Sequence, residues 1–532
     1  MPTLDWIGKD KVINHHKDVP YKVLERKYSF DESGMHKEDI HSNNMIIHGD
    51  NLEALKSFLP QYEGKIKCIY IDPPYNTGNE GWIYNDNVND PKIKKWLGEV
   101  VGKEGEDLSR HDKWLCMMYP RLVLLQKLLA EDGAIFISID DNEHANLLLV
   151  CNEIFGSNNF IQDIIWNKRV SPARDAKFFS TDHEYILVYS KNKESLTTHF
   201  LPRTEKNNSY YKNPDNDPRG PWNSAAYTCN KSRDERPNLY YPITNPYTGE
   251  KIFPKESAVW AYSEETYQQH VRDNLLYWGV NGEAKQPRKK AFLSEVGDVV
   301  PRSVWSHSDV GSTQKATMEN NTIFNMRAFS YPKVSTLVER IIQIASDKDS
   351  IVLDSFAGSG TTAHAVLNMN KSDGGNRKFI LVEMGDYADT ITAERVKRVI
   401  NGYGEEKNAV EGTGGNFSYY ELGNALFMQD GTINNEVDIT EVRKYVWYTE
   451  TNGIEYKEDI REKYFLGSYN DTAYYFYYEK DRVTILDYEF LTSVHKKEQT
   501  YVMYADSCAL SDSDLQKWNI TFKKIPRDIE HI

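Results

Sequence analysis

Short apolar runs alternate with helix-like segments in two parts of this chain, and the alternation predicts an α/β fold. The run at 66–71 is continuous rather than alternating in its apolar residues, which is typical of a parallel sheet covered on both faces. Between them, apolar residues recur at helical spacing. Strands are expected at 45–48, 66–71, 134–139, 183–189, 351–353 and 379–382, and helices at 52–59, 114–129, 146–155, 334–345 and 361–370.

The pattern breaks at both ends and in the middle of the chain. The first 44 residues are polar and predict an arm, while residues 195–330 are rich in Pro, Asn, Tyr and Trp and predict a separate inserted module. Beyond Gly404 the chain is tyrosine-rich and alternating, which predicts a small α+β appendage. The polar stretch from Asn76 to Ser109 is too long for an ordinary connection and indicates a functional loop. The boundaries expected from these changes are 1–44, 45–194, 195–330, 331–404 and 405–532.

Composition and charge narrow the class of protein. A chain of 532 residues accommodates two to four domains, and no apolar run approaches the roughly 18 residues of a membrane span. Without a signal peptide and with five scattered cysteines, we expect a cytoplasmic protein with reduced thiols and no metal site. The net charge of −15 is unusual for a DNA-binding protein. However, residues 405–532 hold 14 basic and 24 acidic residues, whereas residues 201–310 hold 15 basic and 14 acidic, including Arg288-Lys289-Lys290.

A glycine-rich turn follows the strand expected at 351–353. In Gly358-Ser359-Gly360-Thr361-Thr362-Ala363, small residues let a ligand approach the backbone, and the next helix offers free N–H groups to an anion. No lysine follows Gly360, so the turn is not the phosphate loop of an ATPase. Taken alone, it fits a dinucleotide, S-adenosylmethionine or a simple strand-to-helix turn. Glu383 ends the next strand, where a carboxylate can accept both hydroxyls of a ribose.

A second loop, Asp72-Pro73-Pro74-Tyr75, follows the strand expected at 66–71. The exocyclic amine of a nucleobase is a poor nucleophile, because its lone pair is delocalised into the ring. An acceptor such as Asp72, together with a carbonyl that precedes a proline, can take both N–H groups and free that lone pair. Prolines hold the acceptors in place before the substrate arrives. The ring of Tyr75 can stack on a base that has been extruded from the duplex.

The two loops together, separated by a central insert, resemble the β-class permutation of DNA amino-methyltransferases. More narrowly, the chain resembles the modification (Mod) subunit of Type III restriction-modification systems. The resemblance covers most of the chain, and further segments that carry it are Trp6-Ile7-Gly8-Lys9, Gly49-Asp50-Asn51-Leu52, Asn76-Thr77-Gly78-Asn79, Tyr331-Pro332-Lys333, Thr362-Ala363-His364-Ala365-Val366 and Phe522-Lys523-Lys524-Ile525-Pro526-Arg527. One departure is Val334, where the family usually has proline after the lysine.

The resemblance implies a fold and a set of roles. The fold would be a Rossmann-like, circularly permuted S-adenosylmethionine-dependent methyltransferase sheet, with 45–194 as its catalytic half and 331–404 as its cofactor-binding half. Residues 195–330 would be the target-recognition domain, and the aspartate form of the first loop is the usual adenine-N6 variant. The catalytic residues would be Asp72, Pro73, Pro74 and Tyr75, and the cofactor S-adenosylmethionine would be held by Asp50, Lys333, Asp354, Phe356, Gly358, Gly360, Thr361 and Glu383. A helix-capping role for Asp50 is an equally simple interpretation.

The predicted function is therefore site-specific, metal-independent methylation of adenine N6 in double-stranded DNA. Expected partners are a second copy of the chain, through its acidic C-terminal part or its N-terminal arm, and a separate restriction subunit. The nearest alternative is cytosine-N4 methylation on the same fold. Two alternatives from other classes are a nicotinamide dehydrogenase, which leaves the loop at Asp72 without a purpose, and a DNA- or RNA-binding scaffold without catalytic activity.

Overall fold

The computed structural model of the chain describes residues 3–77, 110–174, 176–451, 454, 456–457 and 462–529. It divides into two compact units, one formed by residues 1–199 and 302–532 and the other by residues 200–301. Most of the predicted functional loop between Asn76 and Ser109, namely residues 78–109, lies outside the described residues. None of the helices described is long and apolar enough to cross a membrane.

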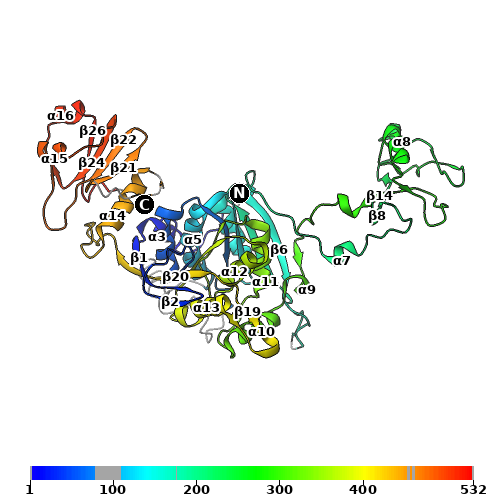
Figure 1. Ribbon diagram of the computed structural model, residues 1–532, viewed down its shortest axis with the longest axis horizontal. Helices are drawn as coiled ribbons and strands as arrows, with labels where there is room; N and C mark the ends of the chain where they lie inside the picture. Colours follow the sequence, from blue (N-terminus) through cyan, green and yellow to red (C-terminus); the bar gives the residue numbers. More distant parts are fainter. Residues whose placement is uncertain are drawn as a thin grey trace. The chain divides into compact units, whose positions relative to one another are not determined.

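A mixed sheet of eleven strands forms the centre of the larger unit (Figure 1). Strands β5, β4, β16, β17, β3 and β20 run parallel to one another, and β7 adds to β5 in the antiparallel direction. In spatial order the strands are β15 (Val304–Trp305), β6 (Phe160–Asn167), β7 (His183–Ser190), β5 (Leu129–Ile139), β4 (Ile66–Ile71), β16 (Ile351–Asp354), β17 (Lys378–Glu383), β3 (Met45–His48), β20 (Asn416–Ala425), β1 (Lys22–Asp31) and β2 (Gly34–His36).

Helices cover this sheet, as predicted from the continuous rather than alternating apolar residues of a strand such as β4 (Figure 1). All six residues of β4 are buried. Ile69 and Ile71 join the core that includes α3 and α5, whereas Cys68 and Tyr70 alternate with them and point to the other face. Each buried side chain of this size contributes about 1.5–3 kcal/mol. The helices are α1 (Lys9–Val12), α2 (His15–Asp18), α3 (Asn51–Tyr62), α5 (Arg110–Leu128), α6 (His144–Cys151), α9 (His307–Val310), α10 (Thr313–Phe324), α11 (Ser335–Ala345), α12 (Thr361–Asp373) and α13 (Glu394–Asn401).

The expected boundaries after residues 44 and 404 do not coincide with the limits of the large sheet. Residues 1–44 were expected to form an arm, but β1 pairs with β20 along its whole length and belongs to the sheet. Its pattern is difficult to detect in the sequence because polar residues such as Glu25 and Lys27 occupy the exposed positions of a strand near the edge. Strand β20 lies beyond residue 404, so the sheet also continues into the segment expected to form the appendage.

The end of the chain folds as the predicted small α+β appendage. Its four-stranded sheet has the order β21-β22-β24-β26, and Tyr475 and Tyr504 are buried within it. The tyrosine-rich alternation therefore marks strand cores, as expected from the period of two. Its elements are α14 (Ile439–Thr451), β21 (Phe465–Tyr469), β22 (Thr472–Phe476), β23 (Ile485–Leu486), α15 (Tyr488–Thr492), β24 (Thr500–Ala505), β25 (Ser507–Cys508), α16 (Asp512–Lys517) and β26 (Ile520–Lys524).

The smaller unit, residues 200–301, has an aromatic core made by Tyr227, Tyr241, Trp260 and Trp278. Residues 302–330, which the sequence assigned to the insert, belong instead to the larger unit. The elements of the smaller unit are α7 (Glu205–Asn208), β8 (Trp222–Ala226), β9 (Thr228–Cys229), β10 (Ile243–Thr244), β11 (Lys251–Ile252), β12 (Val259–Trp260), α8 (Glu264–Arg272), β13 (Leu276–Tyr277) and β14 (Arg288–Phe292).

Candidate active site

The two loops singled out in the sequence lie side by side. Strand β4 ends at Ile71 and β16 ends at Asp354, and these strands are parallel neighbours, with Leu353 opposite Ile69. The loop that begins at Asp72 and the glycine-rich turn therefore leave the same edge of the sheet from adjacent strands. The carboxyl ends of parallel strands are where open α/β sheets place their ligands.

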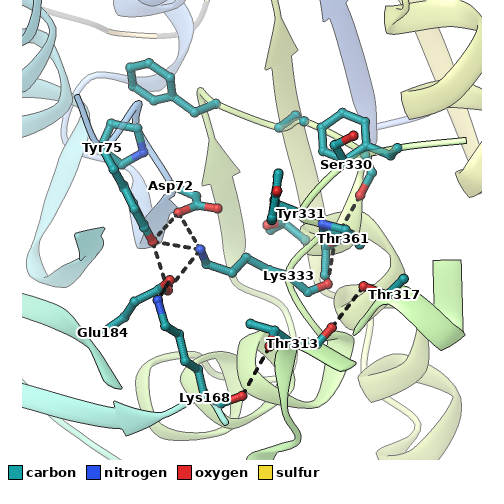
Figure 2. Close-up of a pocket in the computed structure, with 18 of the residues that line it drawn as sticks. Asp72, Tyr75, Lys168, Glu184, Thr313, Thr317, Ser330, Tyr331, Lys333 and Thr361 are labelled. Atoms are coloured by element: carbon teal, nitrogen blue, oxygen red, sulfur yellow. Dashed lines mark hydrogen bonds and ion pairs between the residues drawn. The ribbon is translucent and has the colours of Figure 1, made fainter. Parts of the chain in front are cut away.

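A cavity of about 470 Å³ opens between these loops (Figure 2). Its wall includes eight of the twelve predicted site residues: Asp72, Pro73, Tyr75, Lys333, Asp354, Phe356, Gly358 and Thr361. Pro74, Asp50, Gly360 and Glu383 are not part of the wall. Residues to which the sequence assigned no role in the site complete it, among them Lys168, Glu184, Thr313, Thr317 and Tyr331.

A charged network joins the first loop to the opposite wall (Figure 2). The ammonium of Lys333 lies 2.9 Å from Oδ1 of Asp72 and 3.2 Å from Oε2 of Glu184, and it donates to the hydroxyl of Tyr75 at 2.7 Å. That hydroxyl lies 2.8 Å from the same Oδ1 of Asp72. Lys168 pairs with the other oxygen of Glu184 at 2.8 Å. Among the described residues, none donates to Oδ2 of Asp72, which leaves that oxygen available to a ligand.

Burial and neighbouring charges act on this network in opposite directions. Burial raises the pKa of Asp72, and the ammonium of Lys333 counteracts part of that rise. Burial would likewise raise the pKa of Glu184, but Lys333 and Lys168 outweigh it and the pKa is lowered. Burial would lower the pKa of Lys333, yet Asp72 and Glu184 hold it above the ordinary value. Lys333 is therefore charged, and its charge favours the ionised, accepting form of Asp72.

Asp354 is a buried carboxyl at the base of the glycine-rich turn, with a side chain engaged by its own loop. Oδ1 accepts the amide of Phe356 at 3.0 Å and Oδ2 accepts the hydroxyl of Thr362 at 2.5 Å. No cation of the described residues pairs with it, and burial raises its pKa to about 7. A positively charged ligand bound beside this carboxyl would stabilise its ionised form, which no cation of the described residues does.

Polar side chains of other elements fix the glycine-rich turn by hydrogen bonds. Gly358 and Gly360 have φ values of +52° and +82°, the left-handed region that glycine adopts without strain. Glu383 accepts the amide of Gly358 at 2.7 Å with one carboxylate oxygen and the amide of Gly385 at 2.9 Å with the other, so both oxygens are hydrogen-bonded to the backbone. Arg395, fully buried, donates to the hydroxyls of Ser359 and Thr361, both at 2.9 Å.

Two other predicted residues have visible structural roles outside the cavity wall. Oδ1 of Asp50 caps α3 by accepting the amides of Leu52 and Glu53 at 2.8 and 3.3 Å. The carbonyl of Pro74 accepts the indole N–H of Trp114 at 2.6 Å, which fixes the loop against α5. The neighbouring carbonyl of Pro73 receives no hydrogen bond from the described residues.

Glu184 and Lys168 are site residues that sequence reasoning missed. Glu184 is the second residue of β7 and its side chain is 8% exposed, although the rest of that strand is mostly apolar. An acidic residue inside a buried strand is the one sequence signal that pointed to it, because such a carboxylate requires a partner. Lys168 follows the end of β6 and carries no comparable signal.

The smaller unit contains the basic cluster noted in the sequence, but only part of it is exposed. Lys290 is buried and pairs with Asp215 at 2.5 Å and with Asp217 at 2.8 Å. Arg288 is exposed and donates to the hydroxyl of Ser224 at 2.9 Å. In the part of the chain that the structure describes, no group of three or more His, Cys, Asp and Glu residues could hold a metal ion.

Comparison with known proteins shows that the chain is similar to enzymes that modify DNA. A family model described as DNA methylase matches residues 66–394. The chain is 34% identical to the Type III restriction-modification enzyme StyLTI Mod subunit of Salmonella typhimurium, over 74% of this chain and 62% of that protein. It is 33% identical to the Type II methyltransferase M.KpnI of Klebsiella pneumoniae, over 64% of this chain and 81% of that protein. These matches confirm the resemblance inferred from the motifs.

The matches cover only part of the Mod subunits, and the chain is also similar to a solved structure. The chain spans 56 to 66% of the length of the Mod subunits that it matches. Among solved structures, it is similar to the PvuII DNA methyltransferase (cytosine-N4-specific), with a TM-score of 0.36 and 13% identity over 66% of this chain and 86% of that chain.

Proposed function

Because the chain belongs to the DNA methylase family, we propose that it transfers a methyl group from S-adenosylmethionine to the N6 amine of adenine in double-stranded DNA. The observation that carries the proposal is the single cavity into which both the Asp72 loop and the glycine-rich turn open. One loop offers acceptors for an amine and the other offers a seat for a cofactor, and methyl transfer requires the two within bonding distance.

The acceptors in the cavity suit an exocyclic amine. Oδ2 of Asp72 accepts one N–H of the extruded adenine, and the carbonyl of Pro73 accepts the other, so the nitrogen lone pair is freed from the ring. S-adenosylmethionine, when bound, supplies a methyl group whose bond to the sulfonium sulfur breaks as the bond to N6 forms. Asp72 receives the proton that N6 loses, a role favoured by the rise that burial imposes on its pKa. Lys333 keeps Asp72 ionised before the base arrives.

The cofactor fits the residues of the glycine-rich turn. Asp354 is buried without a cation among the described residues and would pair with a positive group of S-adenosylmethionine. Phe356 and Thr361 line the same wall, and Gly358 allows close approach of the ligand to the backbone. We keep Gly360 and Glu383 as residues that shape this seat. The contacts of Glu383 with ribose and of Asp50 with adenine remain predictions.

Adenine is favoured over cytosine by two features. The loop has aspartate at position 72, the form that resembles adenine-N6 enzymes, and the most similar relatives include Type III Mod subunits. Cytosine-N4 methylation is the second candidate, because its amine suits the same two acceptors. We further propose that residues 200–301 recognise the DNA sequence, through exposed basic and aromatic side chains such as Arg288 and Tyr247.

The partners also belong to the proposal. By analogy with the Mod relatives, whose names describe subunits of restriction-modification enzymes, we propose that the chain works with a separate restriction subunit. We also propose a homodimer. Light scattering of the full chain tests this directly, since a single monomeric mass at all concentrations would contradict it.

The decisive experiment is transfer of labelled methyl groups from S-adenosylmethionine to mixed genomic DNA, followed by digestion to nucleosides. Label in N6-methyladenosine is the expected result. Label in N4-methylcytosine would keep the mechanism and overturn the base assignment. An absence of labelled DNA, with the cofactor bound and the Asp72→Ala variant indistinguishable from the wild type, would contradict the methyltransferase proposal.

A further inference from the structure

The loop between β6 and β7 leaves and returns at the wall of the active-site cavity. Lys168 and Arg169 at its start and Glu184 just beyond its end all line the cavity. The amide of Lys168 donates to the carbonyl of Asp182 at 2.9 Å and closes the neck of the loop. Residues 170–174 and 176–181 therefore form an excursion from the rim of the cavity, and we call them the rim loop.

Two aromatic side chains of the rim loop are exposed to solvent. Phe178 is 81% exposed and Phe179 is 92% exposed. Burying a phenylalanine is worth about 1.5–3 kcal/mol, so two adjacent exposed rings at the mouth of a cavity indicate a surface that is covered in a complex. The backbone beneath them is ordered by Ser180, whose hydroxyl accepts the amide of Ala173 at 2.7 Å.

Basic side chains surround these rings. Arg174 and Lys177 are exposed on the rim loop, and Arg169 is exposed at its neck. None of the described residues forms a salt bridge with these three, although Lys177 lies 5.3 Å from the centre of the ring of Phe178. In a chain with a net charge of −15, unpaired cations beside exposed rings favour a partner that is anionic and also has flat apolar faces. Duplex DNA has both properties.

We propose that the rim loop is the wedge that holds the duplex open during catalysis: Phe178 and Phe179 enter the gap left by the extruded adenine, while Arg169, Arg174 and Lys177 contact the flanking phosphates. This inference rests on the proposed function, because it requires DNA in the cavity. Apolar side chains inserted between base pairs are a known means of stabilising unstacked DNA. The location at the cavity rim is what a wedge requires, since the gap and the extruded base belong to the same nucleotide of one strand.

The test compares the wild-type full chain with a Phe178→Ala, Phe179→Ala double variant on two DNA duplexes that contain the methylated sequence. In one duplex the target adenine is paired with thymine, and in the other it faces an abasic position, so that it leaves the stack with less resistance. Both rings are exposed, so the double variant should fold normally. Loss of stacking is expected to reduce kcat/KM on the paired duplex by about 10- to 100-fold. On the abasic duplex we expect a loss of less than about threefold.

Matched controls separate a wedge from a general surface effect. Tyr488→Ala removes a 57% exposed ring in the C-terminal part and should leave both duplexes unaffected. A Phe178→Trp, Phe179→Trp variant should restore activity on the paired duplex, because a larger ring still stacks. Equal losses on the two duplexes, or no loss on either, would overturn the wedge. Failure of the wild type to methylate either duplex would instead count against the proposed function.

Discussion

The buried carboxyl of Asp354 predicts that cofactor binding depends on pH. Its pKa is raised to about 7 by burial, with the carboxylates of Asp72 and Glu383 adding to the rise. A positive group of S-adenosylmethionine placed beside it would lower that pKa by about 1 to 3. Binding therefore releases a proton below pH 7, and the cofactor binds more weakly as the pH falls.

The size of the change in affinity follows from the pKa of the free protein and from its fall on binding. If the pKa falls from about 7 in the free protein to between about 4 and 6 in the complex, the dissociation constant at pH 5.5 exceeds that at pH 7.5 by roughly 5- to 25-fold. This corresponds to about 1–2 kcal/mol of binding free energy. Isothermal titration calorimetry of the full chain with S-adenosylmethionine at several pH values measures it, and buffers of different ionisation enthalpy count the released protons.

The matched control is Asp354→Asn, which keeps the acceptor for the amide of Phe356 but cannot ionise. The pH dependence between 5.5 and 7.5 should disappear in this variant. Burial also raises the pKa of Asp72 and of Glu383, so dependence that survives in Asp354→Asn would belong to those groups. If wild type and Asp354→Asn lost affinity equally on acidification, the assignment of the cation to Asp354 would be wrong.

Three further changes test other parts of the site. Asp72→Ala should lower kcat for labelled methyl transfer by about 10²- to 10⁴-fold and change the dissociation constant of S-adenosylmethionine by less than about threefold, whereas an equal loss of binding would assign Asp72 to the cofactor. Arg395→Met leaves Glu319, its partner at 3.0 Å, largely enclosed and without a cation, and should lower the free energy of unfolding in urea by about 3–5 kcal/mol; an unchanged midpoint contradicts this. Gly360→Ala places a Cβ 2.9 Å from the carbonyl oxygen of Thr392, whereas Gly374→Ala, also at positive φ, meets no atom within 4 Å. Thermal denaturation should therefore show the larger loss for Gly360→Ala, by about 1–3 kcal/mol, and equal losses would show that the carbonyl does not constrain the turn.

The sequence was sufficient for the elements that carry the site. The strand expected at 66–71 is β4 (Ile66–Ile71), and the strand expected at 351–353 is β16 (Ile351–Asp354). Both are mainly apolar, non-alternating runs, and each is followed by a strong conformational signal, a proline pair in one case and a glycine-rich turn in the other. Where a run is apolar on both faces and has clear ends, local composition determines the element.

A polar strand near the edge of the sheet and contacts between long polar side chains could not be predicted from the sequence in the same way. Strand β1 (Lys22–Asp31) has polar residues at its exposed positions, so its composition is that of a polar segment and only its pairing with β20 reveals a strand. Lys168, just after the end of β6, and Glu184, in β7, are 16 residues apart, and their contact depends on how β6 and β7 pair. Pairing of this kind is set by tertiary packing, which local patterns do not encode.

The backbone and the ammonium of Lys333 lie beside different loops of the site, and the sequence predicted only the first of these positions. Its position just before α11 (Ser335–Ala345) places its backbone beside the glycine-rich turn, and its carbonyl accepts the hydroxyl of Thr361 there at 3.3 Å. Its ammonium, at the end of a long flexible stem, instead lies 2.9 Å from Asp72 in the other loop. The backbone position was predictable, but the direction of a side chain with four methylene groups was not. The same residue thus links the two loops, so a change at Lys333 is expected to act on the proposed amine acceptor, Asp72, and on the proposed cofactor turn together.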